Sequence, residues 1–133
     1  IGTAAVADYR PEQPATSKIK KTSDRLDLSL ERTVDILHAV AQRPGRPYTV
    51  GFAAETNNVE ENALAKLKRK NLDLIAANEV GDSKVFDQDD NALTLLWPQG
   101  GKLALGAAPK TELAAQMLDF IVTRFTATRG TAQ

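Results

Sequence analysis

The chain has 133 residues, 42% of them hydrophobic, which is enough for one domain with a buried core. Its formal net charge is zero, which argues against an overall electrostatic attraction to nucleic acids or anionic membranes. The sequence has no cysteine, one histidine and no apolar run long enough to span a membrane, so we expect a soluble cytoplasmic domain without disulfides, thiol catalysis or a histidine-based metal site.

The first 32 residues predict two strands around a loop. The apolar run IGTAAVADY, residues 1–9, predicts a buried strand that ends in polar residues. Residues 10–25 contain prolines and several cations but little that is apolar, which predicts a mobile loop. The alternating LDLSLER, residues 26–32, predicts a half-buried strand. Since no initiator methionine or signal peptide is visible, we expect a fragment that lacks the N-terminal part of its domain.

A helix and a central strand are expected next. Thr33 is predicted to cap a helix that ends near Gln42 and carries His38 as a structural residue. The following RPGRP forces a turn, and YTVGFAA, residues 48–54, is continuously apolar, as central parallel strands usually are. This part of the chain therefore predicts a helix that leads into the middle of a sheet.

A second helix and strand follow. Asn57 with Glu60 three residues later has the capping-box pattern, and the helix should end near Asn71. Residues 72–80, LDLIAANEV, predict another buried strand. Both predicted central strands end in polar residues, and ligands bind at the carboxyl ends of parallel strands. We therefore expect a ligand site at this edge of the sheet.

The last third predicts a hairpin and a helix. A loop over residues 81–90 precedes NALTLLWPQGGKLALG, residues 91–106, in which PQGG separates two alternating runs. Trp97 is expected to be exposed there, either in a dimer contact or on an edge hairpin that covers its own core. A helix should begin at Thr111, and residues 126–133 should form a frayed tail. The apolar residues expected on one face of this helix are Leu113, Met117, Phe120, Ile121 and Phe125.

The order of these elements predicts a single α/β domain portion over residues 1–133, with a Rossmann-like, mostly parallel sheet flanked by helices and a β-hairpin near the C-terminus. Neither the G-x-G-x-x-G nor the G-x-x-x-x-G-K-[ST] phosphate loop occurs. The absence of the first argues against a redox domain that binds a dinucleotide.

The residue types leave two interpretations open for the cations and for Asp8. At 100° per residue, Lys66 and Lys70 lie on the edge of the apolar arc of their helix. They either pack their stems and keep their ammonium groups in water, or bind a polyphosphate as two point charges. The loop residue Lys18 is either simply solvated or part of a lid over a reacting phosphate. Asp8 is either a turn residue or an acceptor for a ribose or base.

Four stretches, AAVADYRP, KIKK, GFAAETNN and KRKNLDLIAANEV, closely resemble phosphopantothenoylcysteine synthetase, also called phosphopantothenate–cysteine ligase. The similarity covers nearly the whole chain. In bacteria this enzyme is commonly the carboxyl-terminal half of a bifunctional coenzyme A biosynthesis protein. Its preceding glycine-rich segment has no counterpart here.

The resemblance implies a set of nucleotide contacts. Lys18 matches the mobile-loop lysine that converts the acyl-cytidylate intermediate, and it is the implied catalytic residue. The family's N-P-D-I helix start reads TVDI here, so Asp35 and Ile36 match it whereas Thr33 and Val34 depart from it. The implied nucleotide-binding residues are Gly2, Thr3, Ala4, Asp8, Lys18, Val34, Asp35, Ile36, Leu37, Phe52, Lys66 and Lys70.

The resemblance further implies the reaction and its partners. The substrates would be CTP, 4'-phosphopantothenate and cysteine, the cofactor Mg²⁺, and the products of CTP would be CMP and pyrophosphate. FMN would belong only to a separate decarboxylase domain. The site would be completed across a homodimer. The alternative is a non-catalytic nucleotide-binding or dimerisation fragment of the same enzyme.

Overall fold

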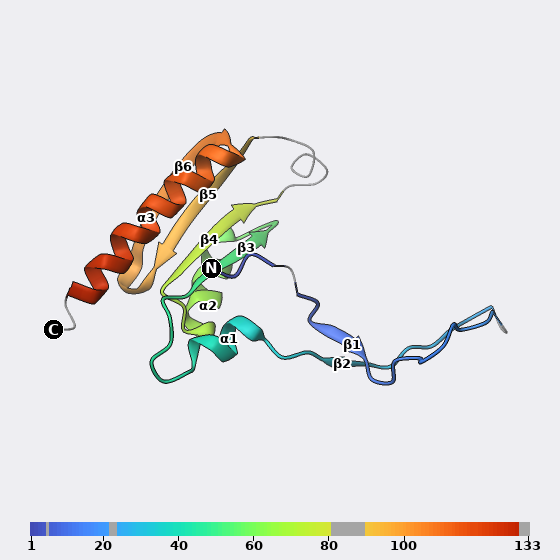
Figure 1. Cartoon of the computed structure of the whole chain (residues 1–133). Helices are drawn as coiled ribbons and strands as arrows, with labels where there is room; N and C mark the ends of the chain where they lie inside the picture. The colour runs from blue at the N-terminus through green and yellow to red at the C-terminus, as the bar shows by residue number, and fades with distance from the viewer. Residues whose placement is uncertain (5, 22–23, 81–89, 131–133) are drawn as a thin grey trace.

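The computed structural model describes residues 1–4, 6–21, 24–80 and 90–130. Within these residues the chain forms two sheets and three α-helices (Figure 1). The elements, in chain order, are β1 (Tyr9–Pro11), β2 (Leu30–Arg32), α1 (Ile36–Ala41), β3 (Val50–Glu55), α2 (Val59–Lys70), β4 (Leu74–Glu79), β5 (Asp90–Trp97), a short 3₁₀ turn (Pro98–Gly100), β6 (Gly101–Pro109) and α3 (Lys110–Gly130).

The main sheet has the strand order β3-β4-β5-β6. Strands β3 and β4 are parallel and joined through α2, whereas β4–β5 and β5–β6 pair antiparallel. The α/β class and the C-terminal hairpin are thus confirmed, but the sheet is mixed rather than mostly parallel. Only ten residues separate Glu79 from Asp90, and a parallel crossover needs a dozen or more. The polypeptide therefore returns antiparallel.

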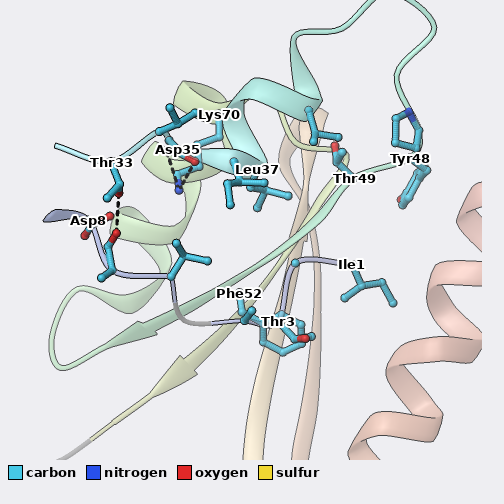
Figure 2. A pocket seen from close by; sticks show the side chains of 18 residues that line it. Ile1, Thr3, Asp8, Thr33, Asp35, Leu37, Tyr48, Thr49, Phe52 and Lys70 are labelled. Carbon is cyan, nitrogen blue, oxygen red and sulfur yellow. Dashed lines mark hydrogen bonds and ion pairs between the residues drawn. The ribbon is translucent and has the colours of Figure 1, made fainter. Parts of the chain in front are cut away.

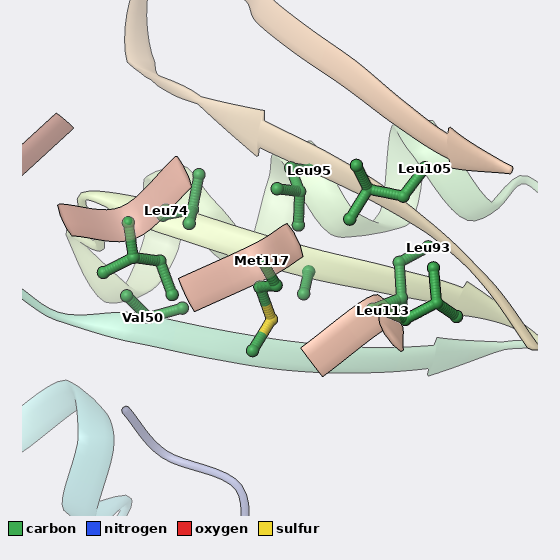
Figure 3. Packing of buried hydrophobic residues seen from close by; sticks show 9 residues of the cluster. Val50, Leu74, Leu93, Leu95, Leu105, Leu113 and Met117 are labelled. Carbon is green, nitrogen blue, oxygen red and sulfur yellow. The ribbon is translucent and has the colours of Figure 1, made fainter. Parts of the chain in front are cut away.

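Helices cover both faces of this sheet. Helix α3 packs on one face, where its apolar stripe meets alternate residues of the strands (Figure 3). Helix α2 packs on the other face through Ala63 and Leu67, which are fully buried. The cluster beneath α3 comprises Val50, Leu74, Ala76, Leu93, Leu95, Leu105, Leu113, Met117 and Ile121. The cluster beneath α2 comprises Ala41, Ala53, Ala63, Leu67, Leu72, Ile75, Ala77 and Leu96. The predicted stripe of α3 is thereby confirmed at its buried positions.

The N-terminal prediction is wrong in two respects. Residues 1–8 form no strand where they are described, although Gly2 N–H donates to Val50 O at the outer edge of β3 (2.8 Å). Strands β1 and β2 instead pair with each other in an arm, described over residues 9–21 and 24–32, that projects from the body (Figure 1). Leu26 and Leu28, predicted to be half-buried, are exposed. A two-stranded ribbon has no layer against which its alternating leucines could pack.

The expected helix caps also differ. Asp35, not Thr33, caps α1, and its side chain accepts a hydrogen bond from the His38 N–H. Helix α2 begins after Asn58, whose backbone is left-handed (φ 44°) and whose side chain makes no capping bond. Its C-terminal end at Asn71 (φ 56°) agrees with the prediction. The chain therefore turns sharply at both ends of α2.

Trp97 of the C-terminal hairpin packs against helix α3. Its ring is half-buried, not exposed as predicted: it packs against Phe120 (centroids 5.0 Å apart) and beneath the Arg124 guanidinium, 4.6 Å from the ring centroid. A Cβ at Gly101 would overlap the indole, so only glycine fits opposite it. These contacts favour the hairpin that covers its own core.

Two further predictions, the frayed tail and the loop before the hairpin, fall partly outside the described residues. Helix α3 continues to Gly130, so the frayed tail predicted from residue 126 is wrong up to that point, and residues 131–133 lie outside the described part. The predicted loop at residues 81–90 also lies outside it, except for Asp90 at the start of β5. No helix in the described ranges has the length and apolar character needed to cross a membrane.

A cluster of polar side chains connects the segments just before the amino ends of β3 and β4. Arg46 makes a two-pronged ion pair with Asp73 (Nη2 to Oδ1, 2.8 Å), whose Oδ2 also accepts from the Thr49 N–H at 2.7 Å. Burial raises the pKa of Asp73, but the hydrogen bonds from Arg46 and Thr49 outweigh it and leave the pKa below its ordinary value. The carboxylate is therefore ionised in the folded protein at neutral pH.

We predict that Asp73→Asn lowers the free energy of unfolding by about 1–3 kcal/mol at pH 7, because charge-assisted hydrogen bonds are lost. A carboxyl group whose pKa is lower in the folded protein stabilises the folded state at pH values above its unfolded-state pKa, near 3.9. This contribution is lost as the pH falls through the folded-state pKa. The difference between variant and wild type should thus shrink below about pH 4 in urea titrations. Glu31→Gln, which breaks the exposed Arg10–Glu31 pair, is the control and should change little. Equal losses at pH 7 and pH 3 would contradict the prediction.

Candidate functional site

A cavity of about 540 Å³ lies along the outer edge of β3, between the N-terminal segment and the start of α1 (Figure 2). We call it the edge cavity. Its size is that of a small-molecule site. The predicted nucleotide-binding residues that line it are Gly2, Thr3, Ala4, Asp8, Val34, Asp35, Ile36, Leu37, Phe52 and Lys70. Residues far apart in the sequence therefore meet at one edge of the sheet.

The N-terminal segment is held in the wall of this cavity at two points. Gly2 is tied to β3 through Val50, and a Cβ on Gly2 would lie only 3.2 Å from Leu37 Cδ1. At the other end, Thr33 Oγ1 donates to Ala7 O (2.6 Å) and the Thr33 N–H donates to Asp8 O (2.9 Å). Thr33 thus joins the N-terminal segment to the chain just before α1, instead of capping the helix.

The walls of the edge cavity differ in character. Phe52 is 39% exposed although it lies in the middle of β3, and it lines the cavity beside the N-terminal segment (Figure 2). Tyr48 and Thr49 line the cavity at the beginning of the same edge, and sequence reasoning missed them. The strand itself was predicted, but its place at the edge of the sheet, which brings the partly buried Tyr48 and the buried Thr49 to this cavity, depends on strand order and has no local signal.

A second cavity of about 530 Å³, the basic cavity, adjoins the first and shares Asp8, Thr33, Asp35 and Lys70 with it. Arg32, Lys66, Arg69 and Lys70 line it, with His38 beside them. Lys66 and Lys70 are therefore brought together as the helical wheel predicted. Arg32, Arg69 and His38 were missed, because the wheel turns Arg69 outward and only the path of the chain after the arm brings Arg32 to this place.

Each of the two lysines is already paired with a carboxylate. Lys66 Nζ lies 2.5 Å from Glu55 Oε1, and Lys70 Nζ lies 3.0 Å from Asp35 Oδ2. Burial raises the pKa of Asp35, but hydrogen bonds from the His38 N–H and Lys70 outweigh it, so the pKa is below its ordinary value. Both side chains are partly buried, 37% exposed for Lys66 and 25% for Lys70, and both line the basic cavity.

Lys18 is not brought to the site. It lies on the exposed arm, in neither cavity, as do Lys20 and Lys21. A role for Lys18 at a bound phosphate would require the arm to bend toward the body, and it stays a prediction.

The carboxylates of the site set a limit on metal binding. Among the described residues, no group of three His, Cys, Asp or Glu side chains is placed to hold a metal ion. Asp8 and Asp35 line both cavities, and Mg²⁺ that arrives with a nucleotide needs only one or two protein carboxylates. The residues present therefore fit an ion held largely by its ligand.

Comparison with known proteins gives a consistent result. The family model described as DNA/pantothenate metabolism flavoprotein C-terminal domain matches residues 1–125. The bifunctional coenzyme A biosynthesis protein CoaBC of Escherichia coli is 50% identical over an alignment of 130 residues that covers 94% of this chain and 32% of that protein. The corresponding protein of Haemophilus influenzae is 48% identical over 126 residues, 94% of this chain and 31% of that protein. The chain thus spans about a third of the length of these relatives.

Solved structures agree with the fold. A crystal structure of the C-terminal domain of CoaBC has a TM-score of 0.71 and 35% identity, over 94% of this chain and 53% of that one. The DNA/pantothenate metabolism flavoprotein of Streptococcus pneumoniae has a TM-score of 0.64 at 21% identity, over 90% and 60% of the two chains, and supports the fold alone.

We predict that Thr33→Val loosens the N-terminal segment, because it removes the hydrogen bond to Ala7 O while the volume is kept. The amide protons of Gly2 and Thr33 should exchange with solvent about fivefold faster, as expected for the loss of one hydrogen bond. Thr33→Ser retains the hydroxyl and is the matched control. Equal exchange rates in the two variants, measured by NMR, would show that the hydroxyl does not hold the segment.

Proposed function

The chain belongs to the DNA/pantothenate metabolism flavoprotein C-terminal domain family, and on this premise we propose that it is the CTP-binding portion of a phosphopantothenate–cysteine ligase. Its relatives are named as coenzyme A biosynthesis proteins, which supports a role in that pathway. The chain covers about a third of them, so the complete reaction is proposed for the protein to which it corresponds.

The observation that carries the proposal is the junction of two unlike cavities. The edge cavity is lined by an aromatic residue, Phe52, and by residues 2–4 of the N-terminal segment, which suit a base and a ribose. The basic cavity next to it gathers four cations, which suit a chain of phosphates. A nucleoside triphosphate has these two parts in this order, and Asp8 and Asp35 lie at the junction.

The proposed reaction has two steps. The carboxylate of 4'-phosphopantothenate attacks the α-phosphorus of CTP, which releases pyrophosphate and leaves an acyl-cytidylate. The amine of cysteine then attacks the acyl carbon, loses a proton and displaces CMP. Both steps depend on placing the reactants and neutralising phosphate charge, so the chain needs no nucleophilic side chain of its own.

The residues take distinct roles in this proposal. Lys66 and Lys70 bind the β- and γ-phosphates, Phe52 packs against the nucleoside, and Lys18 contacts the intermediate when the arm closes. Bound Mg²⁺ supplies further neutralisation of phosphate charge, and Asp8 and Asp35 are the residues placed to face it. A second subunit would complete the phosphopantothenate site, while FMN would belong to the separate decarboxylase domain.

A second candidate is a nucleotide-binding module that does not catalyse the reaction by itself. The position of Lys18 outside both cavities favours this alternative for the chain on its own. Calorimetric titration with CTP, ATP and CMP, each with Mg²⁺, tests the binding function that the two candidates share. Selective binding of CTP is expected, and the absence of nucleotide binding would overturn the assignment for this chain.

We predict that Lys66→Ala and Lys70→Ala each weaken CTP binding about tenfold but leave CMP binding within about twofold, because the lost ammonium contacts only the terminal phosphates. Lys68→Ala is the matched control, since Lys68 lies on the exposed face of the same helix and lines neither cavity. Equal losses for CTP and CMP would refute the triphosphate assignment.

For Lys18→Gln we predict CTP affinity within about twofold of wild type and at least a hundredfold slower completion of the ligation, measured in the full-length protein. Product formation would be followed together with accumulation of the acyl-cytidylate. Lys20→Gln, two residues away on the arm, is the control. A large loss of CTP affinity with no intermediate would assign Lys18 to binding instead of chemistry.

A further inference from the structure

Glu55, the last residue of β3, holds Lys66 from the side of the sheet. Its Oε1 is the atom 2.5 Å from Lys66 Nζ, and its Oε2 accepts a hydrogen bond from Asn62 Nδ2 at 3.3 Å. Asn62 Nδ2 also donates to Asn57 O at 3.0 Å. The Glu55 side chain is 15% exposed, against 37% for Lys66. The carboxylate is therefore the fixed member of the pair, and the ammonium is the member that reaches solvent.

This arrangement places a negative charge directly behind a cation of the basic cavity. Lys66 lines that cavity, whereas Glu55 is not among the described residues that line either cavity. A polyphosphate in the basic cavity would be attracted by the ammonium and repelled by the carboxylate behind it. Lys66 would have to share its hydrogen-bond donors between the two anions.

We infer that Glu55 is a positioning residue that competes with bound polyphosphate for Lys66 and so favours release of pyrophosphate after the first step. The inference rests on the proposed function, in which Lys66 and Lys70 bind the phosphates. CTP also has its nucleoside contacts around Phe52 to hold it, but pyrophosphate has only the cations. Repulsion by the Glu55 carboxylate therefore takes a larger share of the binding energy of pyrophosphate than of the binding energy of CTP.

In the second ion pair, between Asp35 and Lys70, the carboxylate is not separated from the cavities as the Glu55 carboxylate is. Asp35 lines both cavities, so a ligand can touch its carboxylate directly, and a substitution there would change contacts as well as charge. Glu55 acts only through Lys66. Glu60 provides a matched control, because it pairs with Lys102 of β6, is about half exposed and lines neither cavity.

The test is calorimetric titration of Glu55→Gln and Glu60→Gln with inorganic pyrophosphate and with CMP, both with Mg²⁺. The glutamine amide oxygen can still accept from Lys66, but its NH2 group cannot accept from Asn62, so the change removes the charge and the long hydrogen bond of 3.3 Å. We expect Glu55→Gln to bind pyrophosphate about fivefold more tightly, the size of one ion pair at a protein surface, with CMP unchanged. Glu60→Gln should alter neither affinity.

A double-mutant cycle separates competition for Lys66 from a structural effect. In a Lys66→Ala background the gain from Glu55→Gln should fall to less than twofold, because the contested ammonium is gone. Glu55→Asp, which keeps the charge but withdraws the carboxylate by one methylene, should give a smaller gain and guards against a folding defect in the glutamine variant.

Unchanged or weaker pyrophosphate binding by Glu55→Gln, or an equal gain from Glu60→Gln, would overturn the inference. So would a protein that binds no pyrophosphate with either residue at position 55. Titration of the wild type with CTP distinguishes this failure from that of the proposed function. If CTP binds and neutralisation of Glu55 changes nothing, only the inference fails. If the pyrophosphate effect is found but CTP does not bind, the proposed function fails together with the role in product release, and only the competition between Glu55 and pyrophosphate for Lys66 stands.

Discussion

The close packing of α2 on β3 and β4 is the contact on which the site depends. Ala63 and Leu67 are completely or almost completely buried against the sheet, so the rotation of α2 about its axis is fixed. Lys66 and Lys70 flank that buried stripe, and their direction follows from it. The same stripe sets the side from which Glu55, at the end of β3, can reach Lys66. Apolar burial thereby determines where charge is presented.

The second requirement is that an edge of the sheet stays accessible. Strand β3 is one of the two edge strands of the main sheet, and in the described residues the short segment around Gly2 hydrogen-bonds to its outer side. Phe52 and the N-terminal segment line the edge cavity at this open edge. Thr33 closes the loop by hydrogen bonding back to Ala7 and Asp8, so that the start of α1 and the N-terminal segment form one wall.

The sequence predicted the elements whose residue pattern is long and local. It failed to predict burial that depends on which other elements pack nearby. The stripe of α3 and the direction of Lys66 and Lys70 follow from helical periodicity, and the hairpin follows from PQGG between alternating runs. The same alternation in LDLSLER predicted burial that does not occur, because periodicity cannot say whether a second layer exists. Trp97 was placed on the right strand but wrongly exposed, since α3 covers it from about twenty residues later. Arg32 and Arg69 join the site only through the path of the chain.

The two asparagines at the ends of α2 limit the insertions and deletions that the sequence of this site can accept. Asn58 and Asn71 both adopt left-handed backbone, a conformation that ends a helix abruptly and that few residues other than glycine and asparagine accept. The helix can therefore neither gain a turn nor slip by one position. A slip of one residue would rotate every side chain by about 100° and carry both ammonium groups away from the basic cavity. Insertions and deletions should consequently be tolerated in the arm but not between these two residues.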